Sequence, residues 1–138
     1  MSGINLGRVL LGGLVAGFIL NCIDAFVGIV LLADEMTAMI TRLNLDPVAA
    51  QNVWPWVGVD FAYGILIVFA YAAMRPRFGP GPKTGVIAGL TLWLAIGTIV
   101  YGFHAMGIFS AHAFLMNAIF TGIGAMLAGV VGGWLYKE

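Results

Sequence analysis

The chain alternates between four long apolar segments and short polar stretches. The apolar segments cover residues 9–32, 54–75, 85–109 and 113–135. A helix that rises about 1.5 Å per residue needs about 20 apolar residues to cross a hydrocarbon core of about 30 Å, and each segment is longer than that. Transmembrane strands would instead appear as alternating segments of about 10 residues, and the sequence has none. The pattern therefore predicts an all-α membrane protein, a four-transmembrane-helix bundle that forms one transmembrane domain over residues 1–138.

The composition points the same way. Of the 138 residues, 62% are hydrophobic and only 9% are charged, and the net charge is zero. A soluble domain is about 45–50% apolar and about 25% charged, and disorder requires low hydrophobicity with high charge. The lack of any basic block argues against nucleic acid as a partner. A single cysteine excludes an internal disulfide and a cysteine-based metal site. We therefore expect the lipid bilayer to be the main surroundings of the chain.

The basic residues predict an orientation. Arg42 lies between the first and second spans, whereas the other basic residues share the opposite side of the membrane. These are Arg8, Arg75, Arg77, Lys83 and Lys137. Cytoplasmic loops of multi-pass proteins carry an excess of Lys and Arg. We therefore expect a multi-pass protein of the inner (plasma) membrane with both termini in the cytoplasm.

The segment between the first two spans predicts a short amphipathic helix on the outer side. Met36, Met39, Ile40 and Leu43 recur at i, i+3, i+4 and i+7 and form one apolar face. Such a helix lies on the membrane surface or caps the bundle. A partner-docking or gating role is the alternative.

The connection between the second and third spans is rich in proline and glycine. Residues 75–83 read Arg-Pro-Arg-Phe-Gly-Pro-Gly-Pro-Lys, which predicts a stiff connection without helix. This stretch, the glycine-rich spans beside it and the Trp-Leu-Tyr-Lys-Glu tail resemble a group of short bacterial four-helix integral membrane proteins of unassigned function. The resemblance implies a bacterial inner membrane and carries no activity with it.

Small residues spaced four apart predict where helices pack. Lipid tails are as apolar as leucine, so small and polar residues, rather than hydrophobic ones, mark the face of a helix that contacts another. The candidate packing residues are Gly13, Gly17, Gly85, Gly89, Ala125, Gly129 and Gly133. They would contact a neighbouring helix or a second copy of the chain.

Polar side chains within the spans are the candidates for a functional site. They are Asn21, Asp24, Asp60, Tyr101, His104 and Asn117, all near the middle or in the outer half. An aspartate at the centre of a span costs about 2.5–3.5 kcal/mol to insert, so it usually has a function or a partner. No Lys or Arg lies at a matching depth. If Asp24 and Asp60 face each other, they share a proton or hold a cation, and His104 would add an exchangeable proton. A structural role, with the carboxyls bonded to Asn, Tyr or backbone groups, is the alternative.

Metal and cofactor binding remain open at this stage. Asp24, Asp60 and His104 would offer a metal one nitrogen and two carboxylates, although no two of them share a helix at ligand spacing. Haem or chlorin ligation by His104 or His112 is a further alternative, and the cofactor is unknown. The sequence has no H-E-x-x-H, no phosphate loop and no G-x-S-x-G, so we do not expect an enzyme.

Two functional hypotheses follow. The first is a small non-catalytic membrane protein, an accessory or scaffold subunit that associates with other membrane subunits or with itself as an oligomer. The second is a small ion, proton or solute transporter or binding protein that uses Asp24 and Asp60 in an outward-facing polar cavity.

Overall fold

The computed structural model describes residues 3–137, and its regular structure is entirely helical over that range. The elements are α1 (Leu6–Phe26), the π-helix η1 (Val27–Leu31), α2 (Ala33–Arg42), α3 (Pro47–Ala50), α4 (Trp54–Phe78), α5 (Pro82–Ala105) and α6 (Ala111–Leu135). Four of the helices, namely α1 with η1, α4, α5 and α6, are long and apolar enough to cross a membrane. The prediction of an all-α chain with four such helices is therefore confirmed.

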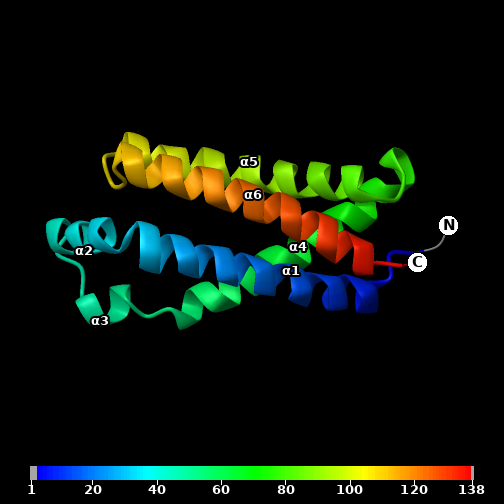
Figure 1. Ribbon diagram of the computed structural model, residues 1–138, viewed down its shortest axis with the longest axis horizontal. Coiled ribbons are helices and arrows are strands. Elements are labelled where there is room, and N and C mark those ends of the chain that lie inside the picture. Colours follow the sequence, from blue (N-terminus) through cyan, green and yellow to red (C-terminus); the bar gives the residue numbers. More distant parts are fainter. Residues whose placement is uncertain (1–2, 138) are drawn as a thin grey trace.

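The four long helices form two antiparallel pairs (Figure 1). Helix α1 packs mainly on α4, α5 packs mainly on α6, and α6 also contacts α1. Both termini and the α4–α5 connection lie at one end of the bundle, which we call the terminal end. The α2 and α3 helices and the α5–α6 turn lie at the opposite end, which we call the distal end.

Glycine brings the backbones of α1 and α4 into contact. Gly64 of α4 lies so close to Gly13 and Gly17 of α1 that a Cβ on Gly64 would come within 2.5 Å of the Gly13 carbonyl oxygen. A Cβ on Gly13 or Gly17 would in turn lie 2.6 Å from the Cα of Ile65 or Phe61, respectively. Such close approach is how small residues hold membrane helices together, because dispersion contacts rather than the hydrophobic effect drive their association.

Glycine also brings the backbones of α5 and α6 into contact. A Cβ on Gly85 would lie 2.6 Å from the carbonyl oxygen of Gly129, and Gly89 lies against the carbonyl group of Ala125. The two helices therefore meet backbone to backbone over this stretch.

Helix α6 also contacts the other pair of helices through glycine. A Cβ on Gly12 would lie 2.5 Å from the carbonyl oxygen of Gly132, and one on Gly133 would lie 2.8 Å from the ring of Tyr71. All seven residues expected to pack helices thus contact another helix of the same chain. No second copy of the chain is needed to explain them.

Two tyrosines close the terminal end. The Tyr136 hydroxyl accepts a hydrogen bond from the backbone N–H of Asn5 at 3.2 Å, and the Tyr71 hydroxyl accepts one from Gly81 at 3.1 Å. The two rings meet edge to face with centroids 6.1 Å apart, and the Arg75 guanidinium lies 5.7 Å from the Tyr136 ring centroid. Both chain ends, α4 and the α4–α5 connection are thereby held together.

The expectation of a helix-free connection over residues 75–83 is wrong. Helix α4 continues through Pro76 to Phe78, and α5 begins at Pro82, so only residues 79–81 lie between them. Pro82 fits because the first residue of a helix has no intrahelical use for its N–H group. Pro76 lies in the last turn, where it removes a single backbone hydrogen bond. Both glycines of the connection have positive φ, 82° and 126°, which lets the chain reverse direction within three residues.

The short helix α2 follows η1 and ends in a left-handed residue. Asn44 has a φ of 51°; its N–H group bonds to the Thr41 carbonyl at 3.2 Å, and the Leu45 N–H bonds to the Ile40 carbonyl at 3.0 Å. These two bonds form a Schellman motif, which satisfies the last carbonyl groups of the helix. Helix α5 ends in the same way at Gly107, with a φ of 79°. Ile40 on the apolar face of α2 is buried.

Candidate functional site

Two carboxyl groups are carried to the same place by α1 and α4. Asp24 lies in the last turn of α1, directly before η1, and Asp60 lies in the second turn of α4. The helix widens just after Asp24, in η1, where the Leu32 N–H bonds to the carbonyl of Val27, five residues back, at 2.9 Å. Such π-helical insertions within helices are frequent at functional sites.

The carboxyl groups of Asp24 and Asp60 face each other. They lie within hydrogen-bonding reach of one another. Asp60 is buried, with 6% of its surface exposed, and Asp24 is half-buried. Within residues 3–137, the Oδ1 atom of Asp24 is buried and has no hydrogen-bond partner. The sequence singled out both residues, and the fold brings them together.

No basic side chain compensates this pair. Among the residues that the structure describes, neither carboxyl group forms an ion pair with Lys or Arg. Two ionised carboxylates in contact repel each other, and each is costly within a membrane span. Protonation of the pair, or a bound cation, would remove this repulsion.

Asn21 lies about one turn before Asp24 on α1 and Tyr63 about one turn after Asp60 on α4, so both extend the polar region toward the terminal end. The Asn21 amide donates to the Gly17 carbonyl at 3.0 Å and to the Val57 carbonyl at 3.4 Å, which ties α1 to α4. These bonds use the amide nitrogen and leave the amide oxygen for another partner. Tyr63, which follows Asp60 by three residues, lies close enough for the charge of Asp24 to act on its phenol. Tyr63 is not among the residues predicted from the sequence, although its i+3 spacing from Asp60 places it on the same helical face.

His104 and Tyr101 lie elsewhere. The Nδ1 atom of His104 bonds to the Phe109 carbonyl at 2.9 Å, and its ring stacks on Phe114 at a centroid distance of 5.1 Å. His104 therefore braces the α5–α6 turn. Tyr101 is 58% exposed and packs its edge against Phe114, so it does not face the bundle interior.

Asn117 lies on α6, where it is half-buried. Its backbone carbonyl accepts a hydrogen bond from the Thr121 hydroxyl at 2.7 Å. No hydrogen bond in the described part of the chain joins its side chain to the carboxyl pair.

A three-ligand metal centre is not formed. Over residues 3–137, no group of three or more His, Cys, Asp or Glu side chains lies close enough together to hold a metal ion. Asp24, Asp60 and His104 thus do not share one site. His112 bonds through Nδ1 to Glu35, so each of the two histidines already uses one ring nitrogen within the protein.

A second polar cluster, absent from the sequence analysis, joins α2 to the α5–α6 turn. We call it the clasp; it consists of Glu35 and Arg42 of α2 and their hydrogen-bond partners, which are Ser110, His112, Gly107 and Ile108. Glu35 accepts hydrogen bonds from the Ser110 hydroxyl and from His112, and both interactions hold the pKa of the Glu35 carboxyl below its ordinary value. Arg42 donates to the carbonyls of Gly107 and Ile108 at 2.6 and 2.7 Å.

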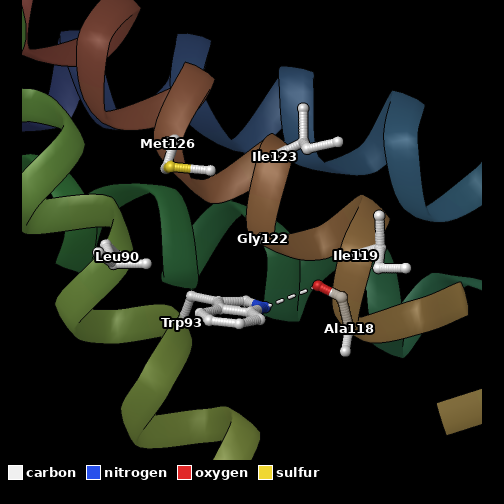
Figure 2. Close-up of a pocket in the computed structure, with 7 residues that line it drawn as sticks. All are labelled: Leu90, Trp93, Ala118, Ile119, Gly122, Ile123 and Met126. Atoms are coloured by element: carbon white, nitrogen blue, oxygen red, sulfur yellow. Dashed lines mark hydrogen bonds between the residues drawn. The ribbon is translucent and has the colours of Figure 1, made fainter. Parts of the chain in front are cut away.

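The groove in Figure 2 is a different kind of surface. It has a volume of about 300 Å³, lies between α5 and α6, and is lined by Leu90, Trp93, Ala118, Ile119, Gly122, Ile123 and Met126. The Trp93 indole donates to the Ala118 carbonyl at 3.0 Å and lies against Gly122. This N–H is already used, and the remaining lining is apolar. The groove therefore suits lipid tails and offers no free hydrogen-bonding side chain to a polar ligand.

No family model, no curated protein and no solved structure matches the chain.

Proposed function

We propose that the protein is a small multi-pass membrane protein that binds and exchanges a small cation, either a proton or a monovalent metal ion, at Asp24 and Asp60. The observation that carries this proposal is the close approach of two carboxyl groups, one buried and one half-buried, with no basic partner among residues 3–137. A purely structural use of the two aspartates would give each oxygen a donor, whereas Oδ1 of Asp24 has none in that range.

The number of ligands favours a small cation. Calcium takes about 6–8 oxygen ligands, whereas this region supplies two carboxyl groups and the amide oxygen of Asn21. A proton needs only the two carboxyl oxygens. A monovalent metal ion removes one unit of negative charge and completes its shell with water or helix carbonyls.

The charge distribution supports a bacterial inner-membrane location with the terminal end in the cytoplasm. Arg8, Arg75, Arg77, Lys83 and Lys137 belong to that end, and Arg42 belongs to the distal end. Under the positive-inside rule, α2 then lies outside, and the carboxyl pair, which is in the distal half of the bundle, is reached from the outer side. This arrangement agrees with membership of the short bacterial membrane proteins that the loop sequence resembles.

An accessory or scaffold role is the other hypothesis. It drew support from small-residue faces free to pack on other subunits, and these faces are used between helices of this chain. Its distinguishing expectation is reproducible co-purification of different polypeptides after gentle extraction from the source membrane.

Carboxyl labelling in proteoliposomes tests the proposal. Dicyclohexylcarbodiimide reacts with protonated carboxyl groups in apolar surroundings, and mass spectrometry locates the adduct. We expect labelling at Asp24 or Asp60 that falls at least tenfold as sodium or pH is raised. We expect the Asp24→Asn, Asp60→Asn double variant to lose both this labelling and any cation flux reported by an enclosed dye.

Asp34→Asn is the matched control, because Asp34 is an exposed aspartate on α2. It should label and conduct like the unaltered protein. Absence of labelling at both aspartates, or a flux that survives their replacement, would overturn the proposal.

A further inference from the structure

The two helix pairs are joined differently at the two ends of the bundle. At the terminal end, backbone meets backbone at Gly12 and Gly132, and the tyrosine contacts add to this closure. At the distal end, Phe26 and Phe120 still touch, with centroids 5.8 Å apart. Beyond that, the hydrogen bonds that cross the distal end within residues 3–137 are those of the clasp.

The clasp matches the charges at the ends of two helices. Arg42 bonds to carbonyl groups just past the C-terminus of α5, where the helix dipole is negative. Glu35 bonds to Ser110 and His112 at the N-terminus of α6, where the dipole is positive. Ser110 is itself the cap of α6, since its hydroxyl accepts from the Ala113 N–H at 3.0 Å. The short helix α2 thus holds both sides of the α5–α6 turn. Glu35, near the start of α2, bonds to the side that begins α6, and Arg42, at its end, bonds to the side that follows α5.

These contacts are of a kind that opens readily. They are exposed, and exposed charged contacts contribute little net stability because water competes for both partners. The apolar contribution of α2 is small, with Ile40 its one buried side chain. Helix α2 is therefore positioned by a few competing hydrogen bonds rather than by a core.

Helix α2 is also coupled directly to the carboxyl pair. It follows η1, and η1 begins three residues after Asp24. A displacement of α2 therefore acts on the π-helical segment whose first N–H bonds to the Asp24 carbonyl.

We propose that α2 is a gate, held closed by the clasp, that controls access of water and small cations from the distal end to Asp24 and Asp60. This inference rests on the proposed cation site for its biological purpose. In structural terms it concerns only the access of water and small cations to the two carboxyl groups. The charged and titratable groups of the clasp are Glu35 and Arg42 on α2 and His112 on α6, and His104 at the end of α5 bonds to Phe109 beside them.

Chemical access to position 24 tests the gate without requiring cation binding. In a Cys22→Ser background, Asp24→Cys is treated with a small charged methanethiosulfonate reagent in proteoliposomes. We expect Glu35→Gln and Arg42→Gln each to raise the modification rate at least tenfold. Asp34→Asn, one residue from Glu35, should leave the rate unchanged.

A cross-link provides the converse test on the native carboxyl pair. Glu35→Cys and Ser110→Cys, in the Cys22→Ser background, are joined with a short bifunctional thiol reagent. Carbodiimide labelling of Asp24 and Asp60 should then fall at least tenfold relative to the untreated protein. The single Glu35→Cys variant given the same reagent should show no change.

The outcomes separate the two proposals. Equal modification rates at position 24 in Glu35→Gln, Arg42→Gln and the parent would overturn the gate. Faster modification in these variants, in a protein whose native pair never responds to sodium or pH, would keep the gate and overturn the cation site.

Discussion

At the scale of single residues, the acidic side chains differ in which groups donate hydrogen bonds to their carboxyl oxygens. Asp46 caps α3 by accepting from the Val48 N–H at 3.0 Å, and Glu35 accepts from Ser110 and His112. Asp24 instead keeps a buried oxygen without a partner in the described range. Asp46 and Glu35 thus have ordinary structural roles, whereas the unusual carboxyl group, that of Asp24, lies in a helix apolar enough to cross a membrane.

The lowered pKa of Glu35 predicts that the clasp opens in acid. Its carboxylate is stabilised by the Ser110 hydroxyl and by His112, so the stabilising effect is complete above the ordinary Glu pKa of about 4.3 and is lost as the pH falls through the lowered value. A spin label at Ala38→Cys, in the Cys22→Ser background, should be immobilised near pH 6 and should become mobile only at a pH below the ordinary Glu pKa of about 4.3.

Glu35→Gln is the control for this prediction, because it removes the titrating group. Its label should be equally mobile at both pH values. A label on the unaltered clasp that stays immobile after Glu35 has been protonated would contradict the ionic description of Glu35.

The residues of the site were only partly predictable from the sequence. Asp24 and Asp60 stand out because ionisable groups are rare and costly in a span. Depth alone also suggested His104, but depth does not give the direction in which a helix face points, and His104 bonds within the α5–α6 turn instead. Tyr63 was missed because a tyrosine in an apolar span is ordinary, and only contact with Asp24 distinguishes it.

At the scale of elements, glycine determines how closely α1 and α4 pack. Gly64→Ala should destabilise the protein by about 1–3 kcal/mol, because its Cβ would overlap the backbone of Gly13 and Gly17. Gly58→Ala, on the same helix, is the matched control, since a Cβ there meets nothing within 4 Å. Thermal unfolding in detergent should show a lower Tm for the first variant alone, and equal Tm values would refute the contact.

The helix pattern was predictable from hydropathy, whereas the helix ends were not. Proline was expected to exclude helix from residues 75–83, yet Pro76 lies in the last turn of α4 and Pro82 starts α5. In both places the missing N–H removes little, so position within the turn matters more than the number of prolines. The contacts of α2 were equally invisible, because Arg42 bonds to backbone carbonyls, which every residue possesses.

At the scale of the whole molecule, the charge distribution predicts the orientation in the membrane. Val48→Cys on α3, where the native side chain is 82% exposed, should react in intact cells with a membrane-impermeant maleimide. Lys137→Cys should react only after the cells are made permeable, with Cys22→Ser as the background of both variants. The reverse pattern of labelling would place the terminal end outside and overturn the proposed orientation.

The backbone contacts at Gly13, Gly17, Gly64, Gly85 and Gly129 also have a genetic consequence. Every amino acid that a single base change can put in place of glycine carries a Cβ, and at each of these positions that atom would overlap a neighbouring helix. Every missense substitution at these codons therefore disturbs the packing of two helices. At the distal end, Gly28, Gly58 and Gly102 have free space around them. Their codons are therefore the ones at which substitutions that add a side chain can accumulate.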